Sequence, residues 1–259
     1  STDLNPEFSE LRVKHLEDFD ARGIYKVKAI LDDNTIIEET FNQFSLYQRR
    51  YFNEKYTYNG ELGAIYSKDK TTFRLWAPLC SSVELRVYNS GTPLAIDKEL
   101  GDDSILFSIP MSYIDRGVWS AVIDGDLEGK YYNYVITNYK NKNIEVVDPY
   151  AKSCGISGIR GMIVDFSKTN PKGWEDIEPH PYKRTEIVVY ETHISDITSS
   201  SSWTNDIEKL KYQKKFKGAY IEGTSFSLNG ITVKTGFDHI KELGVNVVQL
   251  LPFFDSAND

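Results

Sequence analysis

Residues 235–255 read TGFDHIKELGVNVVQLLPFFD, and this stretch decides the expected fold. Thr235 and Asp238 form a start that resembles a capping box, and Gly244 ends the predicted helix. Three apolar residues fall on one helical face: Phe237, Ile240 and Leu243. Residues 245–251 then form a nearly continuous apolar run. An apolar strand directly after a helix is typical of a parallel sheet buried on both faces.

A second apolar strand is predicted upstream, at residues 186–191 (EIVVYE). The two strands and the helix form one βαβ unit. A long polar connection separates the first strand from the helix, with four serines at 199–202 and a basic run at 209–217. One such unit cannot close a barrel or cover both faces of a sheet. The pattern therefore predicts a sheet that needs further strands.

Residues 58–165 have an all-β pattern. Strand-like runs separated by turn residues occur at 71–77, 83–88, 105–109, 118–123, 131–137 and 143–147. In the second run, Val83, Leu85 and Val87 alternate with polar neighbours, as expected for a half-buried strand. Runs of this length and spacing predict a sandwich of immunoglobulin-like size.

The flanking segments carry no chemistry in their sequence. A hairpin is predicted in the leader, from runs 25–31 and 35–41, and a linking segment follows it. Prolines and polar residues indicate a linker after the sandwich. The expected organisation is an N-terminal region at 1–57, a β-sandwich at 58–165, a linker at 166–184 and the βαβ region at 185–259.

Composition excludes several classes of function. The net charge is 30 − 38 = −8, which argues against general binding to nucleic acid or to anionic membranes. The basic run at 209–217 is accordingly interpreted as a solvated face. Cys80 and Cys154 are interpreted as reduced buried thiols. No apolar run approaches the roughly 20 residues of a membrane helix. A cytoplasmic location is the default expectation, and an extracellular one stays open.

Five segments, in order along the chain, carry a resemblance to a known family. They are YNGELGA at 58–64, TFRLWAP at 72–78, VDPYAK at 147–152, VYETHISD at 189–196 and the stretch 244–255. Together they resemble the N-terminal portion of type I pullulanases, which belong to the α-amylase family (glycoside hydrolase family 13). The resemblance implies that 58–165 is a family-48 carbohydrate-binding module. It also implies that 185–259 begins a (β/α)₈ catalytic barrel and contains its first two strands.

The resemblance implies an activity, the hydrolysis of α-1,6-glucosidic linkages in pullulan, glycogen or starch dextrins with retention of configuration. That reaction needs two carboxyl groups about 5 Å apart. In the family they follow the fourth and fifth barrel strands. A barrel that begins near residue 185 has 259 − 184 = 75 residues here, against about 250 for a complete one. We therefore expect no catalytic residue in this segment, and a remainder of the barrel that could be a separate chain.

Several residues are candidates for supporting or binding roles. Glu191, His193 and Asp196 lie at the end of the first barrel strand with Tyr190, and we interpret these four as support for the strand end and its loop rather than as catalytic groups. Trp76 and Trp119 are candidates for stacking a glucose ring, with packing as the alternative. Asp255 is a candidate for lining the cleft. We expect no metal and no cofactor, since no cluster has metal-site spacing.

Two other functions stay open at this stage. One is a non-catalytic α-glucan-binding protein, and the other is a related isoamylase or branching enzyme, which shares the order of sandwich and barrel. An unfinished apolar strand at 245–251 argues against a complete binding module, because an open edge of this kind promotes aggregation.

Overall fold

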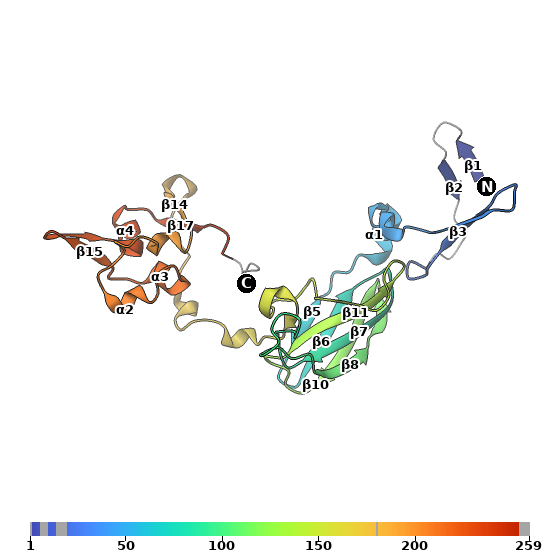
Figure 1. The fold of residues 1–259 in the computed structure, drawn as a ribbon, viewed down its shortest axis with the longest axis horizontal. Helices are drawn as coiled ribbons and strands as arrows, with labels where there is room; N and C mark the ends of the chain where they lie inside the picture. Colours follow the sequence, from blue (N-terminus) through green and yellow to red (C-terminus); the bar gives the residue numbers. More distant parts are fainter. Residues whose placement is uncertain (1, 6–9, 14–19, 180, 254–259) are drawn as a thin grey trace. The chain divides into compact units, whose positions relative to one another are not determined.

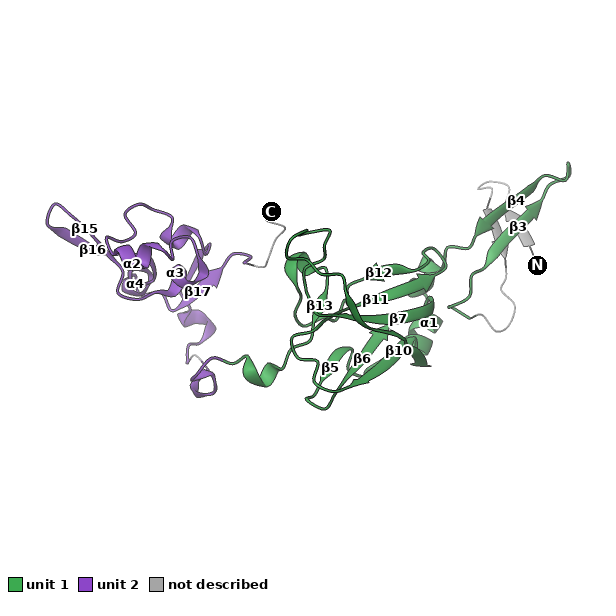
Figure 2. Cartoon of the chain, turned by 60° about the horizontal axis from the view of Figure 1, so that its bottom comes forward, with its two compact units in different colours: residues 1–170 green, residues 171–259 purple. Residues whose placement is uncertain are grey.

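A computed structural model describes residues 2–5, 10–13, 20–179 and 181–253. The chain divides into two compact units, residues 1–170 and residues 171–259 (Figure 2). Within the described residues, no helix is long and apolar enough to cross a membrane.

The first unit contains a sandwich of two antiparallel sheets (Figure 1). One sheet has the order β5-β6-β10-β9, and its strands are β5 (Gly63–Tyr66), β6 (Lys70–Trp76), β10 (Val118–Asp124) and β9 (Ser112–Asp115). The other has the order β12-β11-β7-β8, with β12 (Ile144–Val146), β11 (Tyr131–Asn138), β7 (Cys80–Tyr88) and β8 (Ile105–Pro110); β13 (Gly161–Met162) also pairs with β11. The predicted immunoglobulin-like sandwich is confirmed.

Alternation along the strands builds the core between the sheets. On β6, Phe73 and Leu75 point inward, and on β7 the predicted alternation places Leu85 and Val87 in the core. The ring of Phe73 meets Tyr132 edge to face, with 5.1 Å between centroids. Each large apolar side chain buried in this way stabilises the fold by about 1.5–3 kcal/mol.

A buried carboxylate fixes the chain where it leaves the sandwich. The hydroxyls of Tyr132 and Tyr134 donate to Oδ2 of Asp148, at 2.8 and 3.2 Å, and the backbone N–H of Tyr150 donates to Oδ1 at 2.8 Å. Burial raises the pKa of Asp148 above its usual value, against the opposing effect of these hydrogen bonds.

The leader contains β1 (Thr2–Asn5), β2 (Glu10–Val13), β3 (Lys26–Ile30) and β4 (Ile36–Thr40). The pairing of β3 with β4 forms the predicted hairpin. Next come the 3₁₀ helix η1 (Gln43–Gln48) and α1 (Arg50–Tyr56), which pack on the sandwich. The contact is a small apolar cluster of Ala21, Leu46, Phe52, Tyr56 and Leu79.

Short 3₁₀ helices connect the sandwich to the second unit. They are η3 (Phe166–Lys168), η4 (Trp174–Asp176) and η5 (Arg184–Glu186); η2 (Ile156–Gly158) comes earlier, before β13. Residues 171–179 and 181–186 are exposed. The boundaries expected for the linker and for the flanking domains stay predictions.

We expect limited trypsin digestion to produce a resistant sandwich that ends between residues 172 and 184. Lys172, Lys183 and Arg184 are exposed and lie outside the sheets, whereas the sheets keep their backbone in hydrogen-bonded ladders. Mass spectrometry of a digestion time course identifies the boundary. Early cuts between residues 63 and 138 would contradict a compact sandwich.

The second unit contains the predicted parallel strand pair. β14 (Val189–Thr192) pairs in parallel with β17 (Val247–Leu250), with Val189 opposite Val247. Between them lie η6 (Asp196–Thr198), α2 (Ile207–Leu210), α3 (Phe216–Tyr220), β15 (Ser225–Leu228), β16 (Ile231–Lys234) and α4 (Gly236–Glu242). Both strands of the parallel pair keep exposed side chains, because in the described residues they form a two-stranded sheet.

One local expectation for this unit is wrong. Thr235 makes no side-chain cap to α4; its hydroxyl instead donates to the carbonyl of Trp203. Asp238 accepts from the backbone N–H of Thr224 at 2.7 Å, so both residues tie α4 to the preceding connection. The preceding connection also contains an antiparallel hairpin, formed by β15 and β16.

Candidate functional site

The candidate residues at the end of β14 lie on the surface. Tyr190 and Glu191 are exposed on the strand, opposite Val248 and Gln249 in the parallel register. His193 follows in the loop, where its Nδ1 lies 3.0 Å from the hydroxyl oxygen of Ser195. The expected supporting role of these residues stays a prediction.

The structure brings His193 toward Asp196 rather than toward Glu191. The distance from His193 Nδ1 to the carboxylate oxygen of Asp196 is 3.9 Å, and Ser195 donates to the same oxygen at 3.3 Å. Asp196 also begins η6, so this group orders the first turn after the strand. Asp255 lies outside the described residues.

Trp119 is buried in the sandwich. Its side chain is 6% exposed and belongs to the core, on the same face of β10 as Ala121 and Ile123. The indole N–H donates to the carbonyl of Ala77 at 3.1 Å. The stacking hypothesis for Trp119 is therefore corrected to core packing, because no face of the ring is open.

Trp76 is half-buried between α1 and the sandwich. Its indole N–H donates to the carbonyls of Tyr56, at 2.8 Å, and of Arg116, at 3.1 Å. The ring lies 5.8 Å from that of Tyr47, centroid to centroid. Trp76 thus joins the leader to the sandwich and keeps part of its surface accessible.

A polar pocket of about 400 Å³ lies over the sheet that contains β7 and β11. On one side, Arg86 contacts Glu84 at 2.8 Å and Glu145 at 3.2 Å. The hydroxyl of Tyr88 donates to Glu145, and burial together with this carboxylate raises the pKa of Tyr88 to about 12. These groups can exchange hydrogen bonds with a hydroxyl-rich ligand.

Arg160 forms the other wall of this polar pocket. It is 3% exposed, and its guanidinium carbon lies 3.8 Å from the centroid of the Tyr88 ring. The guanidinium donates to the carbonyls of Ser90 and Asp102 and to Asp103, at 2.6–2.8 Å. Since Arg160 covers the aromatic face, a ligand here would find hydrogen bonds but no stacking surface.

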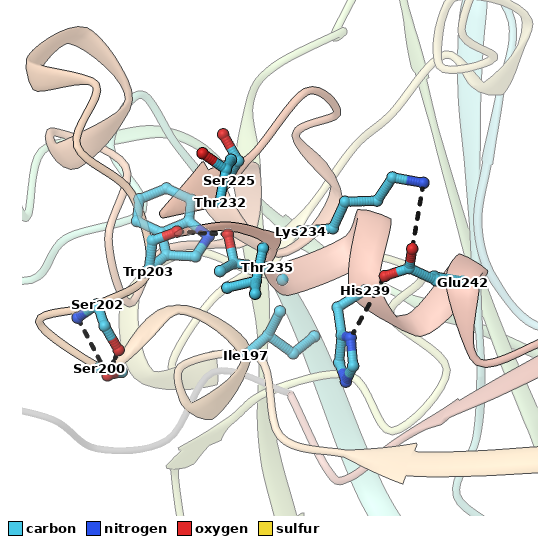
Figure 3. Close-up of a pocket in the computed structure, with 12 residues that line it drawn as sticks. Ile197, Ser200, Ser202, Trp203, Ser225, Thr232, Lys234, Thr235, His239 and Glu242 are labelled. Carbon is cyan, nitrogen blue, oxygen red and sulfur yellow. Dashed lines mark hydrogen bonds and ion pairs between the residues drawn. The ribbon is translucent and has the colours of Figure 1, made fainter. Parts of the chain in front are cut away.

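A larger groove of about 850 Å³ lies in the second unit, between residues 197–203, the β15–β16 hairpin and α4 (Figure 3). Hydroxyl side chains such as Ser200 and Ser202 line it, with an ion pair of 3.6 Å between Lys234 and Glu242. Gly236 has φ +56°, and a Cβ there would lie 2.8 Å from the indole nitrogen of Trp203. Glycine is therefore required where α4 meets Trp203.

Among the described residues, no three His, Cys, Asp or Glu side chains are grouped so that they could hold a metal ion. Sequence reasoning missed Arg160 and Trp203. Neither had a local signal, since both are buried by contacts with segments distant in the sequence.

Comparisons with known proteins agree with this architecture. Residues 61–151 match the family model of carbohydrate-binding module 48 (isoamylase N-terminal domain). A pullulanase of Bacillus subtilis (strain 168) is 31% identical over 209 residues, which are 80% of this chain and 25% of the relative. The sandwich is therefore similar to carbohydrate-binding modules of family 48.

Solved structures give the same result. The pullulanase of Paenibacillus barengoltzii in complex with maltohexaose and α-cyclodextrin is 35% identical, with a TM-score of 0.67, over 80% of this chain and 29% of that chain. The pullulanase of Bacillus acidopullulyticus is 36% identical, with a TM-score of 0.66, over 79% of this chain and 23% of that chain. The resemblance to the N-terminal segment of pullulanases, with a family-48 module, is confirmed. The chain spans a quarter or less of the length of the first curated relatives.

Proposed function

We propose that the intact protein is a pullulanase-type debranching enzyme, which hydrolyses α-1,6-glucosidic linkages in pullulan, glycogen or starch dextrins with retention of configuration. The observation that carries the proposal is the order of the two units. A family-48 sandwich precedes a parallel strand pair, β14 and β17, connected through α4. Pullulanases align with this chain across four-fifths of its length.

In this proposal β14, α4 and β17 are the first βαβ unit of a (β/α)₈ barrel. The connection from 193 to 235 leaves the carboxyl end of β14, and this is the end of a barrel at which active sites form. The exposed faces of β14 and β17 are then contact surfaces for the remaining strands and helices, supplied by further sequence of the same protein. The nucleophile and the acid/base carboxyl group belong to those later strands.

The sandwich supplies contacts to α-glucan in the same proposal. The class of polymer follows from the family-48 match and from the maltohexaose complex of the Paenibacillus barengoltzii pullulanase. The role of Tyr190, Glu191, His193 and Asp196 is to hold the first strand end and its loop, because His193, Ser195 and Asp196 already bind one another there.

We expect the intact protein to release reducing ends from pullulan, and the 259-residue chain alone to leave pullulan unchanged. Retaining hydrolysis requires two carboxyl groups about 5 Å apart, and these are assigned to later strands. Reducing-sugar assays with pullulan measure the activity, and linear amylose without branch linkages is the control substrate. An inactive intact protein contradicts the proposed reaction, and an active isolated chain contradicts the assignment of the carboxyl groups.

A further inference from the structure

A second cavity of the first unit, distinct from the polar pocket, has the composition of a sugar-binding groove. It lies where η1 meets the turn after β11, and it encloses about 520 Å³. Aromatic side chains from both segments and from the end of β6 line it: Phe44, Tyr47, Trp76 and Tyr139. Ligand sites commonly have volumes of 300–1,000 Å³, so the size suits a short oligosaccharide. We refer to this cavity as the aromatic groove.

One side chain links the two walls of the aromatic groove. Oδ1 of Asn42 accepts from the backbone N–H of Phe44, at 3.0 Å, and from the hydroxyl of Tyr139, at 2.9 Å. The first bond starts η1, and the second joins η1 to the sandwich across the groove. A ligand entering the groove therefore meets walls that are already positioned, which lowers the entropic cost of binding.

Aromatic ring surfaces remain exposed in the aromatic groove. Phe44 is 66% exposed although it packs edge to face against Tyr47, with 5.5 Å between centroids. A large exposed aromatic side chain that lines a preformed cavity offers a stacking surface to an apolar ring face. The polar pocket lacks this property, because Arg160 covers the ring of Tyr88.

The rim of the aromatic groove supplies groups for hydroxyls. Asn138, Lys140 and Asn141 line it, and Oδ1 of Asn138 accepts from the backbone N–H groups of the other two at 2.9 and 2.8 Å, which fixes the turn. Among the described residues that line the groove, none is acidic. Amide groups beside aromatic rings suit a neutral ligand with alternating ring faces and hydroxyls, which describes a chain of glucose residues.

We propose that the aromatic groove binds α-1,4-linked glucose residues of the substrate, with Phe44 as the outer stacking surface and Trp76 and Tyr139 deeper in the groove. The substrate class rests on the proposed function. The groove would hold part of an α-glucan on the leader and sandwich.

The test is calorimetric titration of the 259-residue chain with maltohexaose. We expect Phe44→Ala to weaken binding about 5- to 10-fold, the value of one aromatic contact. Tyr51→Ala is the matched control, because Tyr51 is 50% exposed on the adjacent α1 and does not line the groove. We expect this control to bind like the parent. Equal urea midpoints for the parent and both variants verify that folding is unchanged.

A titration with cellohexaose, whose linkages are β-1,4, tests the preference for α-glucan, and we expect weaker binding. The proposal is overturned by a parent chain that does not bind maltohexaose, by unchanged binding in Phe44→Ala, or by equal affinity for cellohexaose. Pullulan hydrolysis by the intact protein is measured separately. Failure of that reaction with intact binding contradicts only the proposed activity, whereas activity without binding contradicts only the groove.

Discussion

Replacing Arg160 by alanine is expected to destabilise the sandwich by about 3 kcal/mol. The substitution removes a buried guanidinium that donates to the carbonyls of Ser90 and Asp102 and pairs with Asp103. Two carbonyls then lose a charged donor. The loss falls at the lower end of the range for buried pairs, because the Asp103 side chain is 50% exposed and water can solvate it.

Arg160→Lys should recover only part of this loss. Lysine keeps the charge, but a single ammonium cannot replace the planar fork that reaches three acceptors and stacks on Tyr88. Urea unfolding of the sandwich measures both variants. Arg50→Ala is the control, because Arg50 is exposed and its ion pair with Glu54 spans one helical turn, so its effect should stay within about 0.5 kcal/mol. Equal midpoints for Arg160→Ala and Arg50→Ala would show that Arg160 does not anchor the loop before β8.

The polar pocket beside Arg160 could not be predicted from the sequence. The alternation of Val83, Leu85 and Val87 predicts the inner face of β7, because strand period alone decides it. Arg160 lies in irregular chain, and its burial arises from contacts with residues 90–103, far away in the sequence. No local pattern distinguishes such an arginine from a solvated one.

The β15–β16 hairpin, in contrast, has a clear signal in the sequence. Residues 226–233 read FSLNGITV, in which Asn-Gly separates two short alternating runs. Asn229 and Gly230 both have positive φ, at 50° and 79°, as the tight turn of a hairpin requires. The β15–β16 hairpin was therefore predictable. The orientation of Trp119 was not, because Val118 and Val122 also place apolar side chains on the opposite face of β10.

The second large effect is expected at Asp148, which should both stabilise the fold and make its stability depend on pH. Asp148→Ala leaves the buried hydroxyls of Tyr132 and Tyr134 without their acceptor. An unsatisfied buried polar group costs about 1–3 kcal/mol, so we expect a loss of about 2–4 kcal/mol. Urea unfolding at pH 7 measures it. If the free energy of unfolding falls by less than the cost of one unsatisfied buried hydroxyl, the two tyrosines have found other acceptors.

The pH dependence has a defined sign. Burial raises the pKa of Asp148 in the folded state, so the folded protein holds this proton more tightly than the unfolded chain. The resulting stabilisation is fully present below pH of about 3.9, which is the pKa of an aspartate in the unfolded chain. It is lost as the pH rises through the pKa of Asp148 in the folded state. Relative to Asp148→Asn, which does not titrate, the parent should lose free energy of unfolding over that window.

Asp126→Asn provides a control of opposite sign. Asp126 accepts from the backbone N–H of Glu128 and from the hydroxyl of Tyr66, and these bonds lower its pKa in the folded state. Its contribution is present above the unfolded pKa and is lost as the pH falls through the folded one. The two difference curves against pH should therefore slope in opposite directions. Burial raises the pKa of Asp148, and the hydrogen bonds from Tyr132, Tyr134 and Tyr150 lower it. If the two curves slope in the same direction, the hydrogen bonds outweigh burial and the pKa of Asp148 is lowered.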